Sequence, residues 1–200
     1  MTTFVAYASN FEFYPRNSEV YRYLAPLLAK LNRIDFAFRV DDPSVNKGQM
    51  VSDFDAAFEN ALLVGGAAPF ELRLPPDIPQ KLDFAFAFGG RSVAVEIEKA
   101  NREKILRDIL KCHMYLRAGA DFAIIALPKN YSHTHGIWNL LEFGAQRFRE
   151  CLTYGFGTAD MLGRILLLGF EQFVSSTNAP LSRKSRLDMR ERAAVQSGRP

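Results

Sequence analysis

Residues 82–99 read Leu82-Asp83-Phe84-Ala85-Phe86-Ala87-Phe88-Gly89-Gly90-Arg91-Ser92-Val93-Ala94-Val95-Glu96-Ile97-Glu98-Lys99, with two alternating runs on either side of a glycine pair. A glycine pair between such runs is typical of a two-residue β-hairpin turn, because the favoured turns need positive φ. In that hairpin Phe88 pairs with Arg91, and counting back places Asp83 opposite Glu96. The segment therefore predicts a hairpin whose far end carries carboxylates.

Three carboxylates share one face of this hairpin, since Glu98 lies two residues beyond Glu96. The other face is a core surface, made of Phe84, Phe86, Phe88, Val93, Val95 and Ile97. Like charges placed opposite each other destabilise a sheet, and a bound divalent cation would offset that repulsion. Carboxylate oxygens suit hard cations such as Mg²⁺. The pattern indicates a magnesium site.

A solvated acidic face is the alternative interpretation. Two features count against it. The remaining positions on this face are small, with alanines at 85, 87 and 94 and only Ser92 polar. The carboxylates also fall where the strand period gives way to a helical one, and strand ends are where sites tend to form.

The composition predicts one domain with a tail. The chain has 200 residues, and 48% of them are hydrophobic, which is enough for a real core. Residues 178–200 hold six basic and two acidic residues, a net charge of +4, which leaves residues 1–177 at about −1. We expect a single domain over 1–177 and a flexible basic tail over 178–200. Because the body is not a polycation, a nucleic-acid partner would be held by local patches.

The cysteines and the apolar pattern favour a cytoplasmic protein. Cys112 and Cys151 lie in helix-like segments with no metal-ligand spacing, so we expect reduced, buried thiols. The first residues show no signal-peptide pattern, and no apolar run approaches the length of a membrane span.

The element order predicts an α/β (α+β) fold, a mixed central β-sheet flanked by helices. Strands are expected over 4–7, 34–40, 121–127 and 164–170, besides the hairpin, and helices over 17–33, 52–64, 102–118 and 137–153. Polar loops are expected over 41–49 and 129–136. The buried stripe of the helix after the hairpin is expected to consist of Ile105, Leu106, Ile109, Leu110, His113 and Leu116.

An acid on one strand, Glu-x-Glu at the end of the next, and then a helix resemble the PD-(D/E)xK nuclease motif. Asp83 takes the first acidic position, Glu96 the second, and Glu98 the third, which is usually lysine. The surrounding segments, from Asn46-Lys47-Gly48-Gln49 to Ile125-Ala126-Leu127-Pro128 and on to Arg164–Phe170, follow the order of type II restriction endonucleases of the BglII and BstYI kind. The resemblance covers roughly residues 44–170.

That resemblance implies a restriction-endonuclease-like fold and a site-specific endonuclease that uses Mg²⁺, with Mn²⁺ as a substitute. Asp83 and Glu96 would hold the metal, and Glu98 would bind it through water or orient the nucleophile. The expected partners are double-stranded DNA at a short palindromic site, a second copy of the chain in a homodimer, and a companion DNA methyltransferase.

The chain departs from that pattern in three ways. No proline precedes Asp83, Glu98 stands where those enzymes carry glutamine, and the hairpin between the acids is longer. The recognition sequence therefore stays open. Lys99 is a candidate for the absent lysine, although strand alternation points it to the opposite face. Asp55 and Glu59 are candidates on a neighbouring helix, with ordinary surface charge as the alternative.

Candidate DNA contacts lie on the two polar loops and on one helix. The loop residues are Asn46, Lys47, Ser132, His133, Thr134 and His135, whose side chains suit phosphates or base edges. Solvated loops are the alternative. Arg102 and Lys104 open the helix past the acids, where they would meet phosphates or only solvent.

Two other functions fit the same residues. One is a repair or junction-processing nuclease of the same fold. The other is a non-catalytic DNA-binding protein that has kept the fold, against which the clustered acids Asp83, Glu96 and Glu98 argue. His113 is interpreted as a core or interface histidine.

Overall fold

The computed structural model describes residues 4–31, 36–40, 49–75, 81–98, 101–133 and 136–174, with side chains over 8, 10–31, 54–75, 81–98, 101–130 and 138–171. The strands of the main sheet are β1 (Phe4–Tyr14), β2 (Phe36–Val40), β3 (Ala68–Pro69), β4 (Phe84–Phe88), β5 (Arg91–Ile97), β6 (Phe122–Pro128) and β9 (Ile165–Val174). The helices are α1 (Glu19–Leu31), α2 (Gln49–Val64), α3 (Lys104–Arg117), α4 (Leu140–Tyr154) and α5 (Ala159–Gly163). A separate pair consists of β7 (Tyr131–His133) and β8 (Gly136–Trp138).

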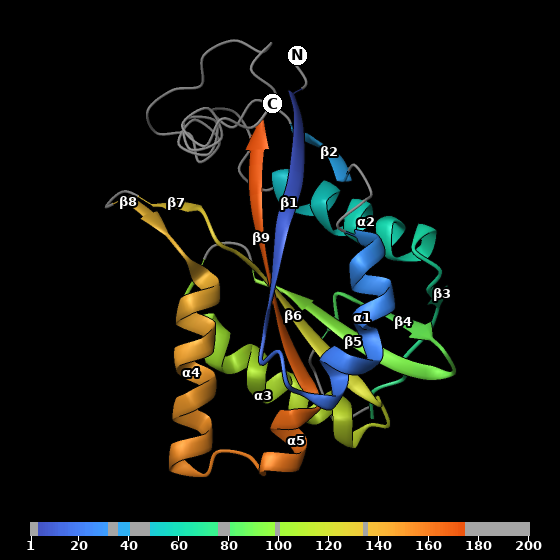
Figure 1. The fold of residues 1–200 in the computed structure, drawn as a ribbon, viewed down its shortest axis with the longest axis vertical. Coiled ribbons are helices and arrows are strands. Elements are labelled where there is room, and N and C mark those ends of the chain that lie inside the picture. Colours follow the sequence, from blue (N-terminus) through green and yellow to red (C-terminus); the bar gives the residue numbers. More distant parts are fainter. Residues whose placement is uncertain are drawn as a thin grey trace.

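The sheet is mixed, in the order β2-β1-β9-β6-β5-β4-β3. β6 pairs in parallel with β5 and β9, and the outer pairings are antiparallel. Figure 1 shows α1 and α2 on one side of this sheet and α3, α4 and α5 on the other. This arrangement confirms the predicted α+β class with a mixed central sheet flanked by helices.

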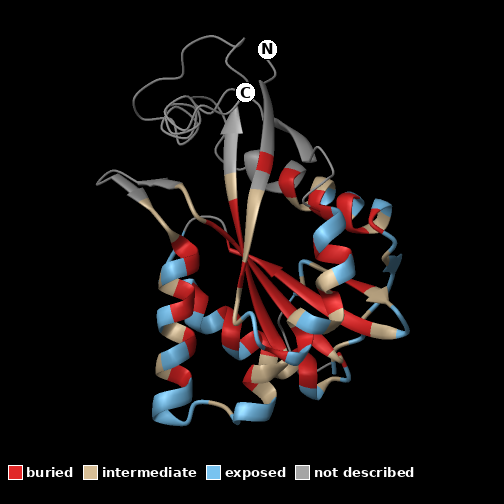
Figure 2. Cartoon of the chain, in the orientation of Figure 1, coloured by how far each residue is buried: buried red, intermediate tan, exposed pale blue. Residues whose placement is uncertain are grey.

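Both faces of the central strands are buried, which explains their nearly continuous apolar sequences. In β6 every residue from 122 to 128 is buried. Phe122, Ile124 and Ala126 pack toward α1 and α2, whereas Ala123, Ile125 and Leu127 pack toward α3, α4 and α5. The buried residues in Figure 2 follow the same central strands. Polar residues of these strands are therefore enclosed unless they lie at a strand end.

The hairpin of β4 and β5 has the predicted register. Phe88 pairs with Arg91, and Ala85 pairs with Ala94. Gly89 and Gly90 have φ of 56° and 84°, the left-handed values that the turn requires and that glycine adopts without strain. The small-residue face is enclosed as expected, since Ala94 is fully buried.

Several element boundaries differ from the prediction. The first strand runs to Tyr14 rather than to residue 7. The expected loop at 129–136 contains β7 and begins the pairing with β8, so α4 starts at Leu140 instead of residue 137. The elements β3 and α5 were not expected. They are too short for a periodic signal.

The buried face of α3 also differs from the prediction. Leu106 and Leu110 are exposed, while Asp108 and Lys111 are buried. The expected buried thiols are confirmed at Cys112 and Cys151. Among the described residues, no helix combines the length and apolarity that crossing a membrane would require. Residues 175–200 lie outside the described part, so one domain with a tail stays a prediction.

Candidate active site

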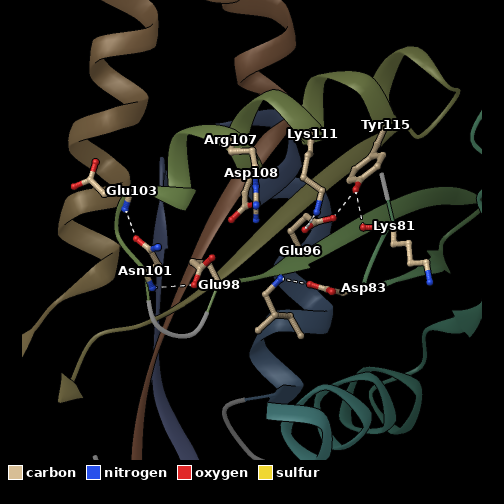
Figure 3. Close-up of polar contacts among 11 residues, drawn as sticks. Lys81, Asp83, Glu96, Glu98, Asn101, Glu103, Arg107, Asp108, Lys111 and Tyr115 are labelled. Atoms are coloured by element: carbon tan, nitrogen blue, oxygen red, sulfur yellow. Dashed lines mark hydrogen bonds and ion pairs between the residues drawn. The ribbon is translucent and has the colours of Figure 1, made fainter. Parts of the chain in front are cut away.

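Asp83 and Glu96 come together where β4 begins and β5 ends. Asp83 is exposed and directly precedes β4, and its Oδ2 accepts a hydrogen bond of 2.7 Å from the backbone N–H of Ile97. The negative charge of Asp83 contributes to raising the pKa of Glu96, so the two carboxylates interact. The hairpin register thus produces the predicted juxtaposition (Figure 3).

The carboxylate of Glu96 is enclosed beneath α3. Lys111 Nζ donates to Glu96 Oε2, and the hydroxyl of Tyr115 donates to Glu96 Oε1 at 2.5 Å. Burial raises the pKa of Glu96 to about 7, with a further rise from Asp83, whereas the hydrogen bonds from Lys111 and Tyr115 oppose that rise. Burial and Glu96 raise the pKa of Tyr115, so its hydroxyl remains a hydrogen-bond donor.

The carboxylate of Glu98 has different partners from that of Glu96. Its Oε1 accepts a hydrogen bond of 2.9 Å from the backbone N–H of Asn101, and the residue is 7% exposed. Its charge also acts on Asp108 of α3. Burial, followed by the charge of Glu98, raises the pKa of Asp108 to about 6, while Lys111 and Arg107 lower it. Glu98 and Asp108 are thus a second pair of interacting carboxylates.

Lys111 connects the two carboxylate pairs. It is ion-paired with Glu96, and its positive charge also lowers the pKa of Asp108. Figure 3 shows Lys111 on α3 above Glu96, with Asp108 one turn earlier on the same helix. A buried ammonium group therefore offsets part of the repulsion that clustered carboxylates create.

The clustered carboxylates interact as two pairs, Asp83 with Glu96 and Glu98 with Asp108. Within the described residues, no group of three or more His, Cys, Asp or Glu side chains is arranged so that it could hold a metal ion. The donor chemistry of Asp83 and Glu96 nevertheless suits Mg²⁺, which is usually bound through one or two carboxylates together with substrate phosphates. Each carboxylate oxygen has more than one lone pair, so the existing hydrogen bonds leave capacity for a metal. The predicted ligand set of Asp83, Glu96 and Glu98 stays a prediction.

The other predicted site residues are mostly outside the described part of the chain. Asn46, Lys47, Thr134, His135 and Lys99 fall there entirely, and Ser132 and His133 belong to β7 without described side chains. Asp55 and Glu59 lie on α2, which packs on the sheet face opposite to Glu96. Their participation stays a prediction.

Among the residues that the structure describes, no carboxylate pairs with His113 of α3. Its ring lies against Gly157, and burial lowers its pKa. This placement agrees with a packing histidine.

Sequence reasoning missed Asp108, Lys111 and Tyr115. These residues recur at spacings of three and four, so they share one side of a helix with Cys112. That polar row is a signal in the sequence, but hydrophobicity alone favours Leu106 and Leu110 as buried positions. Only the position of Glu96 beneath α3 explains why the polar row is buried.

The chain has a likeness to a solved structure but no match in sequence. No family model matches the chain, and no curated protein matches its sequence. The structure is similar to the crystal structure of restriction endonuclease BglII complexed with a DNA 16-mer, with a TM-score of 0.49 and 13% sequence identity. The match covers 84% of this chain and 78% of that chain.

Proposed function

We propose that this chain is a Mg²⁺-dependent endonuclease that hydrolyses phosphodiester bonds in double-stranded DNA. The observation that carries the proposal is that Asp83, which accepts the N–H of Ile97, lies beside Glu96 where β4 begins and β5 ends, with Lys111 paired to Glu96. The PD-(D/E)xK motif that the sequence resembles combines two carboxylates with an ammonium group. Here the ammonium group comes from a helix, and Glu98 occupies the position usually held by lysine.

Asp83 and Glu96 would hold the metal. Bound there, Mg²⁺ would lower the pKa of a water molecule and neutralise charge on the reacting phosphate. Asp83 is exposed, so a metal ion held by its carboxylate would be open to a phosphate of the substrate. Glu96 is held in place by Tyr115 and Lys111, which fixes its direction before DNA binds.

Lys111 would supply positive charge close to the reacting phosphate. Its side chain is 9% exposed, so its charge acts in an environment where water screens weakly. A preorganised cation near developing negative charge stabilises a transition state. In this proposal Lys111, rather than Lys99, serves as the lysine of the motif.

At a finer level, we propose a type II restriction endonuclease. It would act as a homodimer on a short palindromic site, with a companion DNA methyltransferase to protect the host DNA, and Mn²⁺ would substitute for Mg²⁺. The support is the order of segments over residues 44–170, which resembles enzymes of the BglII and BstYI kind. A homodimer fits a palindrome because both share a two-fold axis.

The deciding experiment is digestion of unmethylated phage DNA with Mg²⁺, beside a reaction with EDTA. The variants Asp83→Asn and Glu96→Ala test the site, and Glu71→Ala, at a side chain that is 81% exposed, is the matched control. Discrete fragments from the wild type and from Glu71→Ala, absent in the other three reactions, would support a site-specific metal nuclease. Sequencing the fragment ends would then give the site.

Other outcomes lead to the alternatives. Cleavage of branched DNA without discrete fragments from linear DNA would favour a repair or junction-processing nuclease. Duplex binding without cleavage in either Mg²⁺ or Mn²⁺ would favour the non-catalytic DNA-binding protein. Sedimentation of the protein with and without a palindromic duplex would test the homodimer.

A further inference from the structure

Arg102 lies over two aromatic rings beside the candidate site. Its guanidinium carbon is 4.9 Å from the ring centre of Trp138 and 5.3 Å from that of Phe143. Trp138 ends β8, and Phe143 lies in the first turn of α4. The side chain of Arg102 is 44% exposed, so the group is positioned by the rings while part of it still faces solvent. This combination fixes a planar cation at the surface.

We propose that Arg102, held on Trp138 and Phe143, binds a backbone phosphate of the double-stranded DNA that occupies the candidate active site. The inference rests on the proposed function and deepens it by naming a contact that orients the substrate. Arginine suits this role because its fixed fork of N–H donors matches the oxygens of a phosphate.

The distance to the carboxylates supports the assignment. Arg102 follows Glu98 by four residues, so their Cα atoms are at most about 14 Å apart. Hydrogen bonds of Asn101 and Glu103 hold the segment between Glu98 and Arg102 in a folded rather than extended form. Asn101 N–H donates to Glu98, and Glu103 N–H donates to the side chain of Asn101, each at 2.9 Å (Figure 3). Phosphates follow each other along a DNA strand every ~3.4 Å of helix axis, so a bound duplex has phosphates within reach of both places.

The ion pair between Arg102 and Glu103 leaves the guanidinium group able to bind a phosphate. Its Nε donates to Glu103 at 3.1 Å, and Glu103 also lies 3.8 Å from Arg147. These side chains are substantially exposed, and exposed ion pairs are weak. The guanidinium group has five N–H donors, so a phosphate can be bound through those that face away from Glu103.

Arg91 offers a matched control within the same chain. Its guanidinium carbon lies 5.0 Å from the ring centre of Tyr23 and 5.1 Å from that of Phe122, its side chain is 43% exposed, and it pairs with Glu19 at 2.9 Å. Arg91 begins β5, seven residues from Glu98, which is ~23 Å along an extended strand. It reproduces the local arrangement of Arg102 at the opposite end of the hairpin.

The test is anisotropy of a fluorescein-labelled random-sequence DNA duplex in EDTA, titrated with wild type, Arg102→Ala, Arg102→Lys and Arg91→Ala over a series of KCl concentrations. Arg102→Ala is expected to weaken binding about tenfold and to reduce the slope of log K against log salt by about one. Arg102→Lys should retain the slope with weaker binding. Arg91→Ala should match the wild type in both quantities, and both alanine variants should lower the Tm by similar amounts.

The single tryptophan of the chain gives an independent readout. Adding unlabelled duplex should change the emission of Trp138 in the wild type and in Arg91→Ala. Wild-type affinity and salt slope in Arg102→Ala, with unchanged Trp138 emission in the wild type, would overturn this inference while leaving the nuclease proposal standing. Failure of the wild type to bind duplex at low salt, together with no cleavage, would overturn both.

Discussion

Lys111 and Glu96 form a buried ion pair between α3 and β5, with side chains 9% and 5% exposed. The same carboxylate accepts the hydroxyl of Tyr115 at 2.5 Å. The carboxylate of Glu96 is therefore held by two side chains of α3, the helix that covers it. Removing one partner of such a pair leaves a buried charge without compensation, which costs more than the pair itself contributes.

Lys111→Met is expected to abolish cleavage and to lower the free energy of unfolding by about 3 to 5 kcal/mol, because Glu96 is left buried beside Asp83. Urea unfolding and the cleavage assay measure the two effects. Arg117→Met, at an exposed position in the last turn of α3, is the control and should change neither.

The double variant Lys111→Met with Glu96→Gln separates stability from chemistry. It should recover much of the lost stability, since residue 96 no longer carries a buried charge without a partner, and it should still fail to cleave DNA. Full cleavage by Lys111→Met would remove Lys111 from the proposed mechanism.

Tyr115→Phe tests the second attachment of Glu96. The variant loses a hydrogen bond to a charged group, worth about 1.5 to 3 kcal/mol, and leaves the ring packing in place. We expect a decrease of that size in the free energy of unfolding, together with slower cleavage. Tyr154→Phe, at a residue that is 72% exposed, is the control. Equal stability of Tyr115→Phe and the wild type would contradict a role for the hydroxyl in holding Glu96.

The hairpin and the meeting of Asp83 with Glu96 could be predicted because their signals are local. A glycine pair and strict alternation fix the turn and the register, and the register fixes which residues face each other. The actual partners of Glu98, Asn101 and Asp108, lie beyond the strand, where alternation no longer applies. The sequence therefore predicts one group of three carboxylates, whereas in the structure Asp83 interacts with Glu96, and Glu98 interacts with Asp108.

The polar face of α3 could not be predicted from hydrophobicity alone. By hydrophobicity, Leu106 and Leu110 are expected in the core. In the folded chain Glu96 lies under α3, so the side of the helix that carries Lys111 is buried instead. Tertiary contacts decided which side of α3 is buried. The sequence predicts a loop at β7 and at the first residue of β8, and a helix over the rest of β8, because three residues give too little alternation to recognise a strand.

Asp108 gives a prediction about pH. Its folded pKa of about 6 exceeds the ordinary value of 3.8, so the native protein binds this proton more tightly than the unfolded chain. The stability gained from this tighter proton binding is therefore fully present below about pH 4 and is lost as the pH rises through about 6. The free energy of unfolding of Asp108→Asn, relative to the wild type, should increase across this window by on the order of 3 kcal/mol.

Urea unfolding of both proteins across that window measures the difference. A Glu98→Gln background should show a smaller increase, because the charge that helps to raise the pKa of Asp108 is gone. A difference that stays constant with pH would show that the carboxyl of Asp108 does not titrate there.

The last prediction concerns which carboxylates hold the metal. If Asp83 and Glu96 bind it, Asp83→Asn and Glu96→Gln should each lower the rate of Mg²⁺-dependent cleavage at least about a hundredfold, since a neutral amide replaces a charged ligand. Glu98→Gln should stay within a few fold of the wild type, because the amide oxygen of glutamine can still accept the N–H of Asn101. Titration of each protein with Mn²⁺ in a calorimeter, without DNA, gives a readout that does not depend on turnover. If Glu98→Gln weakens Mn²⁺ binding as strongly as Asp83→Asn, the metal draws Glu98 away from Asn101, and all three carboxylates form the site.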